Sequence, residues 1–147
     1  MAEGKTTNTR VTWVDGLQFV STAEGSRGAF VLDSPSSEGG PAAGTSPVEA
    51  LLSALGGCAG MDVISILKKK RQRVTGLYVE TRGQRAEEHP RRYTHIEMEF
   101  VVRGFGVSPQ AVARAIELSE TKYCSVAASL NAEIVTSYRV EEEPAGA

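Results

Sequence analysis

Between residues 45 and 73 apolar residues recur at intervals of three and four, which predicts one long α-helix. Ser46, Pro47 and Glu49 mark its start as an N-cap, a proline in the first turn and a capping-box glutamate. A basic run, Lys68–Arg73, closes it where the helix dipole favours cations. The apolar positions nearly encircle the helix, which is typical of an element buried on several sides: Leu51, Leu52, Leu55, Met61, Val63, Ile64, Ile66 and Leu67.

Alternation of apolar and polar residues predicts strands on both sides of this helix, at 8–14, 17–23, 28–33, 74–84, 92–103 and 134–142. The first three form an antiparallel meander, because Asp15-Gly16 is a strong hairpin signal. Residues 34–44 are rich in Ser, Gly and Pro and predict a loop. Strand 92–103 has one face for burial, made of Thr94, Ile96, Met98, Phe100 and Val102.

A second helix is expected to begin at Ser108-Pro109, which repeats the N-cap and proline pattern, and to run to about Cys124. Residues 125–131 are expected to form another short helix. The order of strands, helix, strands, helix and strand predicts an α+β fold with helices packed on a largely antiparallel sheet. A chain of 147 residues fits a single domain, 1–147.

The composition restricts the partners. Hydrophobic residues make up 41% of the chain, charged residues 23%, and the formal net charge is -2, so no electrostatic argument favours nucleic acid or an acidic membrane. The amino terminus has no apolar leader, and no apolar run approaches the ~20 residues needed to span a bilayer. We therefore expect a cytoplasmic protein with no nucleic-acid or membrane partner.

Two cysteines, Cys58 and Cys124, are the main candidates for chemistry. In a reducing compartment a stable structural disulfide is not expected, so pairing of the two would be a redox event. No CxxC or Cys/His spacing predicts a zinc site, and no cofactor is expected. His89 in a turn and His95 on a polar strand face are interpreted as structural or solvated.

Three glycines, Gly56, Gly57 and Gly60, flank Cys58 inside the long helix. Each costs roughly 0.5 to 1 kcal/mol relative to alanine, so a compensating reason is expected. One reason is close approach of another backbone or a ligand. Another is a break in the helix that leaves freed N–H groups beside the thiol and makes it more reactive. The alternative is an inert cysteine in tight helix packing.

The stretches TSPVEALLSALGGC and LSETKYCSVAASL, with a long hairpin between them, resemble the OsmC/Ohr family of osmotically inducible and organic-hydroperoxide-resistance proteins. The resemblance covers Val11 to Val140, and DVISILKKKRQ and THIEMEF look more like the less characterised OsmC-like branch than like the peroxidases. It implies an intertwined homodimer, with sheets wrapped around long central helices and active sites at the subunit interface. It also implies thiol-dependent reduction of organic hydroperoxides, with the reducing thiols supplied in many members by lipoyl groups on proteins.

By position, the resemblance makes Cys58 the peroxidatic and Cys124 the resolving cysteine, joined by a disulfide after oxidation. The peroxidases stabilise the thiolate with an arginine from the N-terminal meander, held by a glutamate directly after the helix-start proline. Val48 occupies that position here, and Glu49 lies about 100° round the helix. Two interpretations of Glu49 remain open, a residue that holds the arginine and a capping-box residue. Arg27 is the candidate arginine, and the alternative is that it is a solvated turn residue.

Three functions therefore remain open from the sequence. The first is a thiol peroxidase, for which the loss of the clamp glutamate predicts modest activity. The second is a non-enzymatic redox sensor or small-molecule-binding protein on the same fold. The third is a structural dimer with inert buried thiols.

Overall fold

The computed structural model describes residues 4–34 and 42–146. The chain divides into two compact units, residues 1–51 and 52–147, which are described separately. The single domain expected from the chain length stays a prediction. The loop expected at 34–44 falls largely outside the described residues, because 35–41 are not among them.

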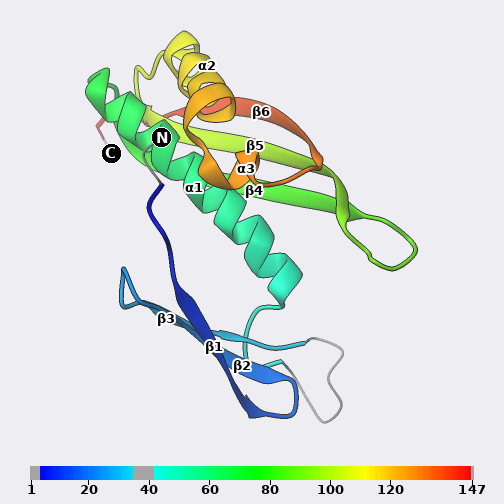
Figure 1. Ribbon diagram of the computed structural model, residues 1–147. Coiled ribbons are helices and arrows are strands. Elements are labelled where there is room, and N and C mark those ends of the chain that lie inside the picture. The colour runs from blue at the N-terminus through cyan, green and yellow to red at the C-terminus, as the bar shows by residue number, and fades with distance from the viewer. Residues whose placement is uncertain (1–3, 35–41, 147) are drawn as a thin grey trace. The chain divides into compact units, whose positions relative to one another are not determined.

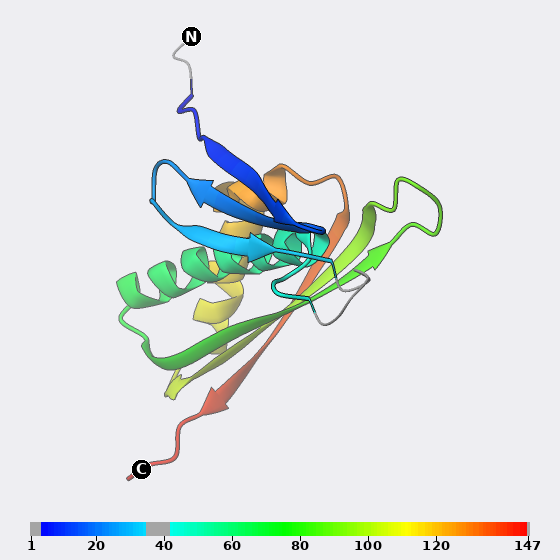
Figure 2. The same ribbon diagram turned by 90° about the horizontal axis from the view of Figure 1, so that it is seen from below.

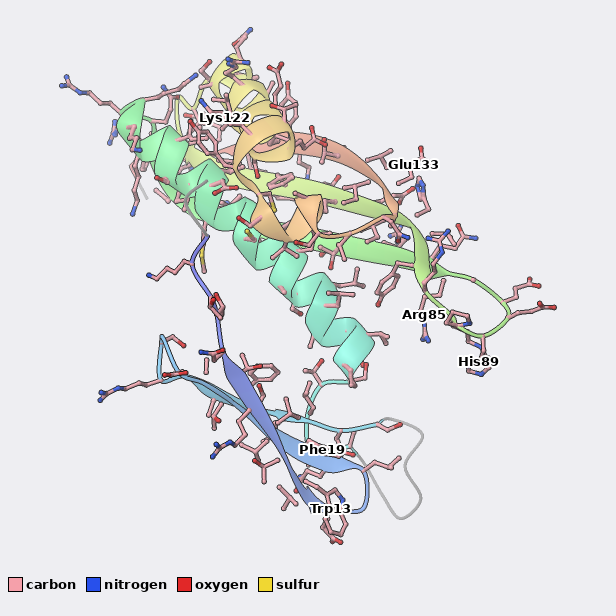
Figure 3. The ribbon with its side chains drawn as sticks, viewed as in Figure 1. Trp13, Phe19, Arg85, His89, Lys122 and Glu133 are labelled. Carbon is pink, nitrogen blue, oxygen red and sulfur yellow. The ribbon has the colours of Figure 1, made fainter. Side chains whose placement is uncertain are left out.

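The N-terminal unit is the predicted antiparallel meander. Strands β1 (Thr9–Asp15), β2 (Gln18–Ala23) and β3 (Ala29–Leu32) pair in the order β1-β2-β3. Gly16 adopts a positive φ of 53° in the first hairpin, a conformation that glycine reaches without steric cost. The aromatic side chains of Trp13 and Phe19 belong to this sheet (Figure 3), and Trp13 is largely exposed.

The long helix α1 spans Pro47–Lys69 and begins where the sequence indicates. The Glu49 N–H donates to the Ser46 hydroxyl at 3.3 Å, and the Ser46 N–H donates to the Glu49 carboxylate at 3.3 Å. These reciprocal bonds confirm the predicted capping box, which satisfies two backbone donors that a helix start otherwise leaves unpaired.

The predicted end of this helix was wrong by four residues. Helix α1 stops at Lys69, and Arg71 takes a left-handed conformation with φ 56°. The Gln72 N–H then donates to the Leu67 carbonyl at 3.0 Å, and the Arg71 N–H to the Lys68 carbonyl at 2.9 Å. This hydrogen-bond pattern is a Schellman motif, which normally places glycine where Arg71 stands, so the sequence carries no stop signal there.

The C-terminal unit is built on a second sheet of the strands β4 (Arg73–Arg85), β5 (Tyr93–Phe105) and β6 (Glu133–Glu142). Strands β4 and β5 pair antiparallel as expected, whereas β6 runs parallel to β5. The connection from β5 to β6 is long enough for a parallel return because it contains helical segments. The described sheets are thus largely antiparallel, and the fold class is α+β as predicted.

The connection contains α2 (Pro109–Leu118), a single π-helical turn (Ser119–Tyr123) and α3 (Ser125–Ala128). The second predicted helix therefore ends at Leu118, and its last turn is widened instead of continuing as α-helix. Figures 1 and 2 show α1, α2 and α3 on one face of the β4-β5-β6 sheet. The sheet's opposite face carries no helix of this unit among the described residues.

The core of the C-terminal unit lies between α1 and β5. One stripe of α1 with a spacing of four, Leu55, Ala59, Val63 and Leu67, is buried, as is the predicted face of β5 at Ile96, Met98, Phe100 and Val102. Val101, on the other face, is buried as well. In register it lies between Tyr78 and Arg139, and the Arg139 guanidinium donates to the Tyr78 hydroxyl at 2.8 Å.

The remaining circumference of α1 differs from the expectation of burial on several sides. Met61 is 72% exposed, and outside the adjoining helix backbone no atom of the described residues lies within 4 Å of a Cβ built at Gly57. The 23 residues of α1 are also long and apolar enough to span a membrane, contrary to the expectation that no apolar segment reaches that length. Its stripe Leu55, Ala59, Val63 and Leu67 packs in the core of the C-terminal unit, and core helices also have this length and composition.

Candidate functional site

Cys58 and Asp62 lie one turn apart on the same side of α1 and are both half-buried. Their spacing of four places the two side chains next to each other. The helix is unbroken through this region, which excludes a break beside Cys58, one of the alternatives considered for the glycines. Close approach explains Gly56 instead, because a Cβ there would lie 3.1 Å from Thr81 Cγ2 on strand β4.

The π-turn positions the second cysteine. The Cys124 N–H donates to the Ser119 carbonyl at 2.9 Å, five residues back, which closes the turn. Cys124 then leaves the helical conformation and becomes the N-cap of α3, with its sulfur accepting from the Ala127 N–H at 3.4 Å. Ser119, which begins the turn, is 1% exposed, and Cys124, which follows it, is 5% exposed.

These elements bring four side chains together. The sulfur atoms of Cys58 and Cys124 and a carboxylate oxygen of Asp62 all lie within 4.8 Å of one another. The Ser119 hydroxyl donates to Asp62 Oδ2 at 2.9 Å and so links the π-turn to α1. Both cysteines are reduced thiols. A disulfide requires an S–S distance of about 2.05 Å, so the pair can bond after a modest side-chain movement.

The electrostatics oppose ionisation of Cys124. Burial is the main cause that raises the pKa of the Cys124 thiol above its ordinary value, and the neighbouring Cys58 raises it further. The Ala127 N–H acts in the opposite direction because its hydrogen bond favours the thiolate. Cys124 is therefore suited to remain a protonated thiol until a reactive group forms on the neighbouring Cys58.

A small pocket of about 190 Å³ opens beside Cys124. It is mostly apolar and is lined by Ala59, Met98, Phe100, Ser119, Glu120, Cys124, Ala127, Ala128, Ala132 and Ile134. Drug-sized ligands occupy clefts of about 300 to 1,000 Å³. The pocket therefore suits a small apolar group and not a large ligand.

The other residues singled out from the sequence belong to other elements or have another role. Arg27 is exposed in the β2–β3 turn with φ 60°, and Glu49 belongs to the capping box described above. His89 lies in the loop that joins β4 and β5 (Figure 3). His95 is half-exposed on β5, with its ring nitrogens 3.7 Å from Glu97 and 3.5 Å from Glu133. Catalytic roles for Arg27 and Glu49 stay predictions.

Sequence reasoning missed Asp62 and Ser119. The spacing C-x3-D on a predicted helix could have indicated that Asp62 shares a face with Cys58. Ser119 gives no such signal, because its partner Asp62 is 57 residues away in the sequence. Their pairing depends on how the helices pack.

Comparison with known proteins identifies the family of the chain. A family profile described as OsmC-like protein matches residues 39–139. The protein YhfA of Escherichia coli (strain K12) is 44% identical over 134 residues, covering 89% of this chain and 96% of YhfA. The chain belongs to the OsmC-like family. The predicted resemblance is thereby confirmed.

Solved structures of similar fold include members and relatives of the OsmC-like family. A hypothetical protein from Aquifex aeolicus VF5 is 31% identical with a TM-score of 0.84, covering 96% of this chain and 100% of the other. An organic hydroperoxide resistance protein from Elizabethkingia anophelis has a TM-score of 0.68 at 13% identity, covering 96% and 100%. The second likeness shows the OsmC-like fold alone.

Proposed function

We propose that this protein is a thiol-dependent peroxidase that reduces organic hydroperoxides through a Cys58 thiolate and a Cys58–Cys124 disulfide. Family membership, and the fold shared with proteins named organic hydroperoxide resistance proteins, support a peroxidase-like role in general. The observation that carries the finer proposal is the pair of reduced thiols whose sulfur atoms lie within 4.8 Å.

The chemistry proceeds in two steps. The Cys58 thiolate attacks the terminal oxygen of the hydroperoxide, the O–O bond breaks, and the alkoxide leaves as an alcohol after taking a proton. Cys58 is then a sulfenic acid. The Cys124 thiol attacks its sulfur, forms the disulfide and releases water. Two thiols of an external reductant restore the pair, and a protein-bound lipoyl group is the dithiol we propose for this step.

Cys58 is the better nucleophile of the two because it is half-buried, whereas Cys124 is almost fully buried. The role of Cys124 as resolving thiol fits its raised pKa, since it reacts only after the sulfenic acid has formed next to it. The carboxylate of Asp62 repels a thiolate at this distance. We therefore propose that activity is modest.

The arginine of the proposed mechanism is Arg27, which would stabilise the Cys58 thiolate. Glu49 is proposed to act as a helix cap in preference to holding that arginine, because its carboxylate already accepts from the Ser46 N–H. Substitution Arg27→Ala should slow oxidation of Cys58 by hydroperoxide. An unchanged rate would remove Arg27 from the mechanism.

The proposal is tested by stopped-flow mixing of the reduced protein with cumene hydroperoxide. We expect stoichiometric loss of both thiols in the wild type and a linked Cys58–Cys124 peptide by mass spectrometry. The Cys124→Ser variant should stop at the sulfenic acid and be overoxidised by excess peroxide. Thiol loss in the wild type no faster than in the Cys58→Ser variant would refute the peroxidase.

The second candidate is a redox sensor on the same fold, favoured by the carboxylate of Asp62 beside the thiols. A sensor needs slow, reversible oxidation without rapid turnover. Its signature in the same experiment would be disulfide formation over minutes, with no acceleration of the cycle by a dihydrolipoyl reductant.

We further propose that the protein works as a homodimer. A groove of about 700 Å³ runs between α1 and β4, and its lining includes Gly57, the exposed Met61 and the exposed Tyr78. Apolar surface of this kind on a core helix is typical of an interface. A second copy of the chain, which would contribute the same surface by two-fold symmetry, is the occupant we propose.

A further inference from the structure

The cluster around the two thiols has the composition of a metal site as well as that of a redox pair. Two sulfur atoms and a carboxylate oxygen lie within 4.8 Å of one another. In tetrahedral zinc sites the Zn–S bond is about 2.3 Å and the Zn–O bond about 2.0 to 2.2 Å, so neighbouring ligand atoms are about 3.5 to 3.8 Å apart. Side-chain rotations that move the ligand atoms by about an ångström would bring the three atoms to this geometry.

We propose that Cys58, Asp62 and Cys124 of the reduced protein bind one thiophilic divalent cation of the zinc class. Two thiolates select such a cation over magnesium or calcium, which prefer oxygen ligands. Three protein ligands leave a fourth position for water or a small molecule. The pocket beside Cys124 provides space on that side of the cluster.

The scaffold of the cluster is typical of metal centres. Cys58 and Asp62 are four residues apart on one helix, the spacing that places two ligands on one face. Cys124 comes from a second element, at the end of the π-turn. The Ser119 hydroxyl donates to Asp62 Oδ2 at 2.9 Å from a buried position, and such hydrogen bonds orient ligating carboxylates.

Asp62 adds an oxygen ligand to the two sulfur atoms. Its carboxylate oxygen lies within 4.8 Å of both sulfur atoms, and a divalent cation between the three groups attracts the carboxylate and both thiolates at once. Binding therefore releases the two thiol protons to solvent.

A consequence follows for the redox cycle, and this step alone rests on the proposed peroxidase. Oxidation of the metal-bound pair consumes one hydroperoxide and two protons, and it yields the disulfide, one alcohol, one water and the free cation. The oxidised protein has lost both thiolate ligands. The cation would thus protect the reduced thiols and be released when they are oxidised.

The binding site is tested on the full-length, metal-free, reduced protein. Zn²⁺ is titrated in competition with a chromophoric chelator, and Co²⁺ serves as the spectroscopic probe. We expect one cation per chain, with thiolate-to-cobalt charge-transfer bands and the intense visible bands of a tetrahedral site. The disulfide form of the same protein should show neither, which controls for binding elsewhere on an intact fold.

Variants then identify the ligands. Asp62→Asn should weaken Zn²⁺ binding at least 10-fold. Ser119→Ala should weaken it by roughly 10- to 100-fold, as is typical when a residue that hydrogen-bonds to a metal ligand is replaced. Cys124→Ser should remove part of the charge-transfer intensity. Glu117→Gln, which removes an exposed carboxylate paired with Arg114 on α2, is the matched control and should bind as the wild type does.

The outcomes separate this inference from the proposed peroxidase. Absence of cobalt charge-transfer bands, or an affinity of Asp62→Asn equal to that of the wild type, would overturn the metal site whatever the peroxidase rate is. Tight binding that depends on Asp62 together with unreactive thiols would support the site and refute the peroxidase. Binding that survives in both Cys58→Ser and Cys124→Ser would place the cation elsewhere and overturn the proposal.

Discussion

Substitution of Asp62 by asparagine should make the thiol pair more reactive toward an alkylating agent. The carboxylate lies within 4.8 Å of both sulfur atoms, so it repels whichever thiolate forms first. Asparagine keeps the size of the side chain and can still accept from the Ser119 hydroxyl, but it removes the charge. The variant therefore isolates the electrostatic contribution of Asp62.

The magnitude follows from the distance. At 4.8 Å, the upper limit of these separations, two unit charges interact by about 3.5 kcal/mol at an effective dielectric constant of 20 and by about 0.9 kcal/mol in bulk water. Cys58 and Asp62 are half-buried, so a value near 1.4 kcal/mol between these limits is reasonable. A repulsion of that size corresponds to about a tenfold effect on a rate, so we expect roughly tenfold faster alkylation of Asp62→Asn at neutral pH.

The assay is the pseudo-first-order rate of iodoacetamide labelling of the reduced, chelator-treated protein, with the labelled cysteine identified by mass spectrometry. The chelator matters because a bound cation would mask both thiols. Glu117→Gln changes the net charge by the same amount on α2 and should leave the rate unchanged. Equal rates for Asp62→Asn and wild type would show that Asp62 does not act on the thiols electrostatically.

Three further outcomes are expected. Glu49→Ala removes the capping-box bond to the Ser46 N–H, so it should lower the free energy of unfolding by about 0.5 to 1 kcal/mol in urea denaturation and leave the peroxide reaction unchanged within twofold. A large loss of rate at unchanged stability would instead support an arginine clamp. Burial raises the pKa of Cys124, so the folded protein holds this proton more tightly than the unfolded chain. The free energy of unfolding of the reduced protein should therefore be greatest below the ordinary thiol pKa of about 8.5 and decline above it. Cys124→Ala should abolish that decline. Met61→Lys should convert the proposed dimer to a monomer in sedimentation velocity at micromolar concentration, whereas a wild-type protein that is already monomeric there would refute the dimer.

Local signals explain which parts of the fold the sequence predicts. Ser46 and Glu49 fix the start of α1 through hydrogen bonds between neighbours, and the alternation of β5 fixes its buried face at Ile96, Met98, Phe100 and Val102. Both depend on residues only a few positions apart. The predicted end of α1 was wrong because Arg71 takes a left-handed conformation that glycine usually adopts, and an arginine at this position gives no stop signal in the sequence.

The direction of β6 and the composition of the site required the three-dimensional structure. Alternation in residues 134–142 indicates a strand but not the strand beside which it lies, and parallel pairing with β5 follows from the long helical connection. The two cysteines were recognised as a pair through family resemblance. Asp62 and Ser119 were not, because a carboxylate and a hydroxyl 57 residues apart have no shared pattern in the sequence.

The π-turn accounts for the geometry that brings these groups together. In a regular α-helix, residues five apart point about 140° away from each other, so Ser119 and Cys124 would not both face α1. The bond from the Cys124 N–H to the Ser119 carbonyl widens the turn by one residue and is followed by the non-helical conformation of Cys124. Ser119 then contacts Asp62, and the sulfur of Cys124 lies beside Cys58. The same backbone irregularity thus supplies the resolving thiol of the proposed peroxidase and the third ligand of the proposed cation site.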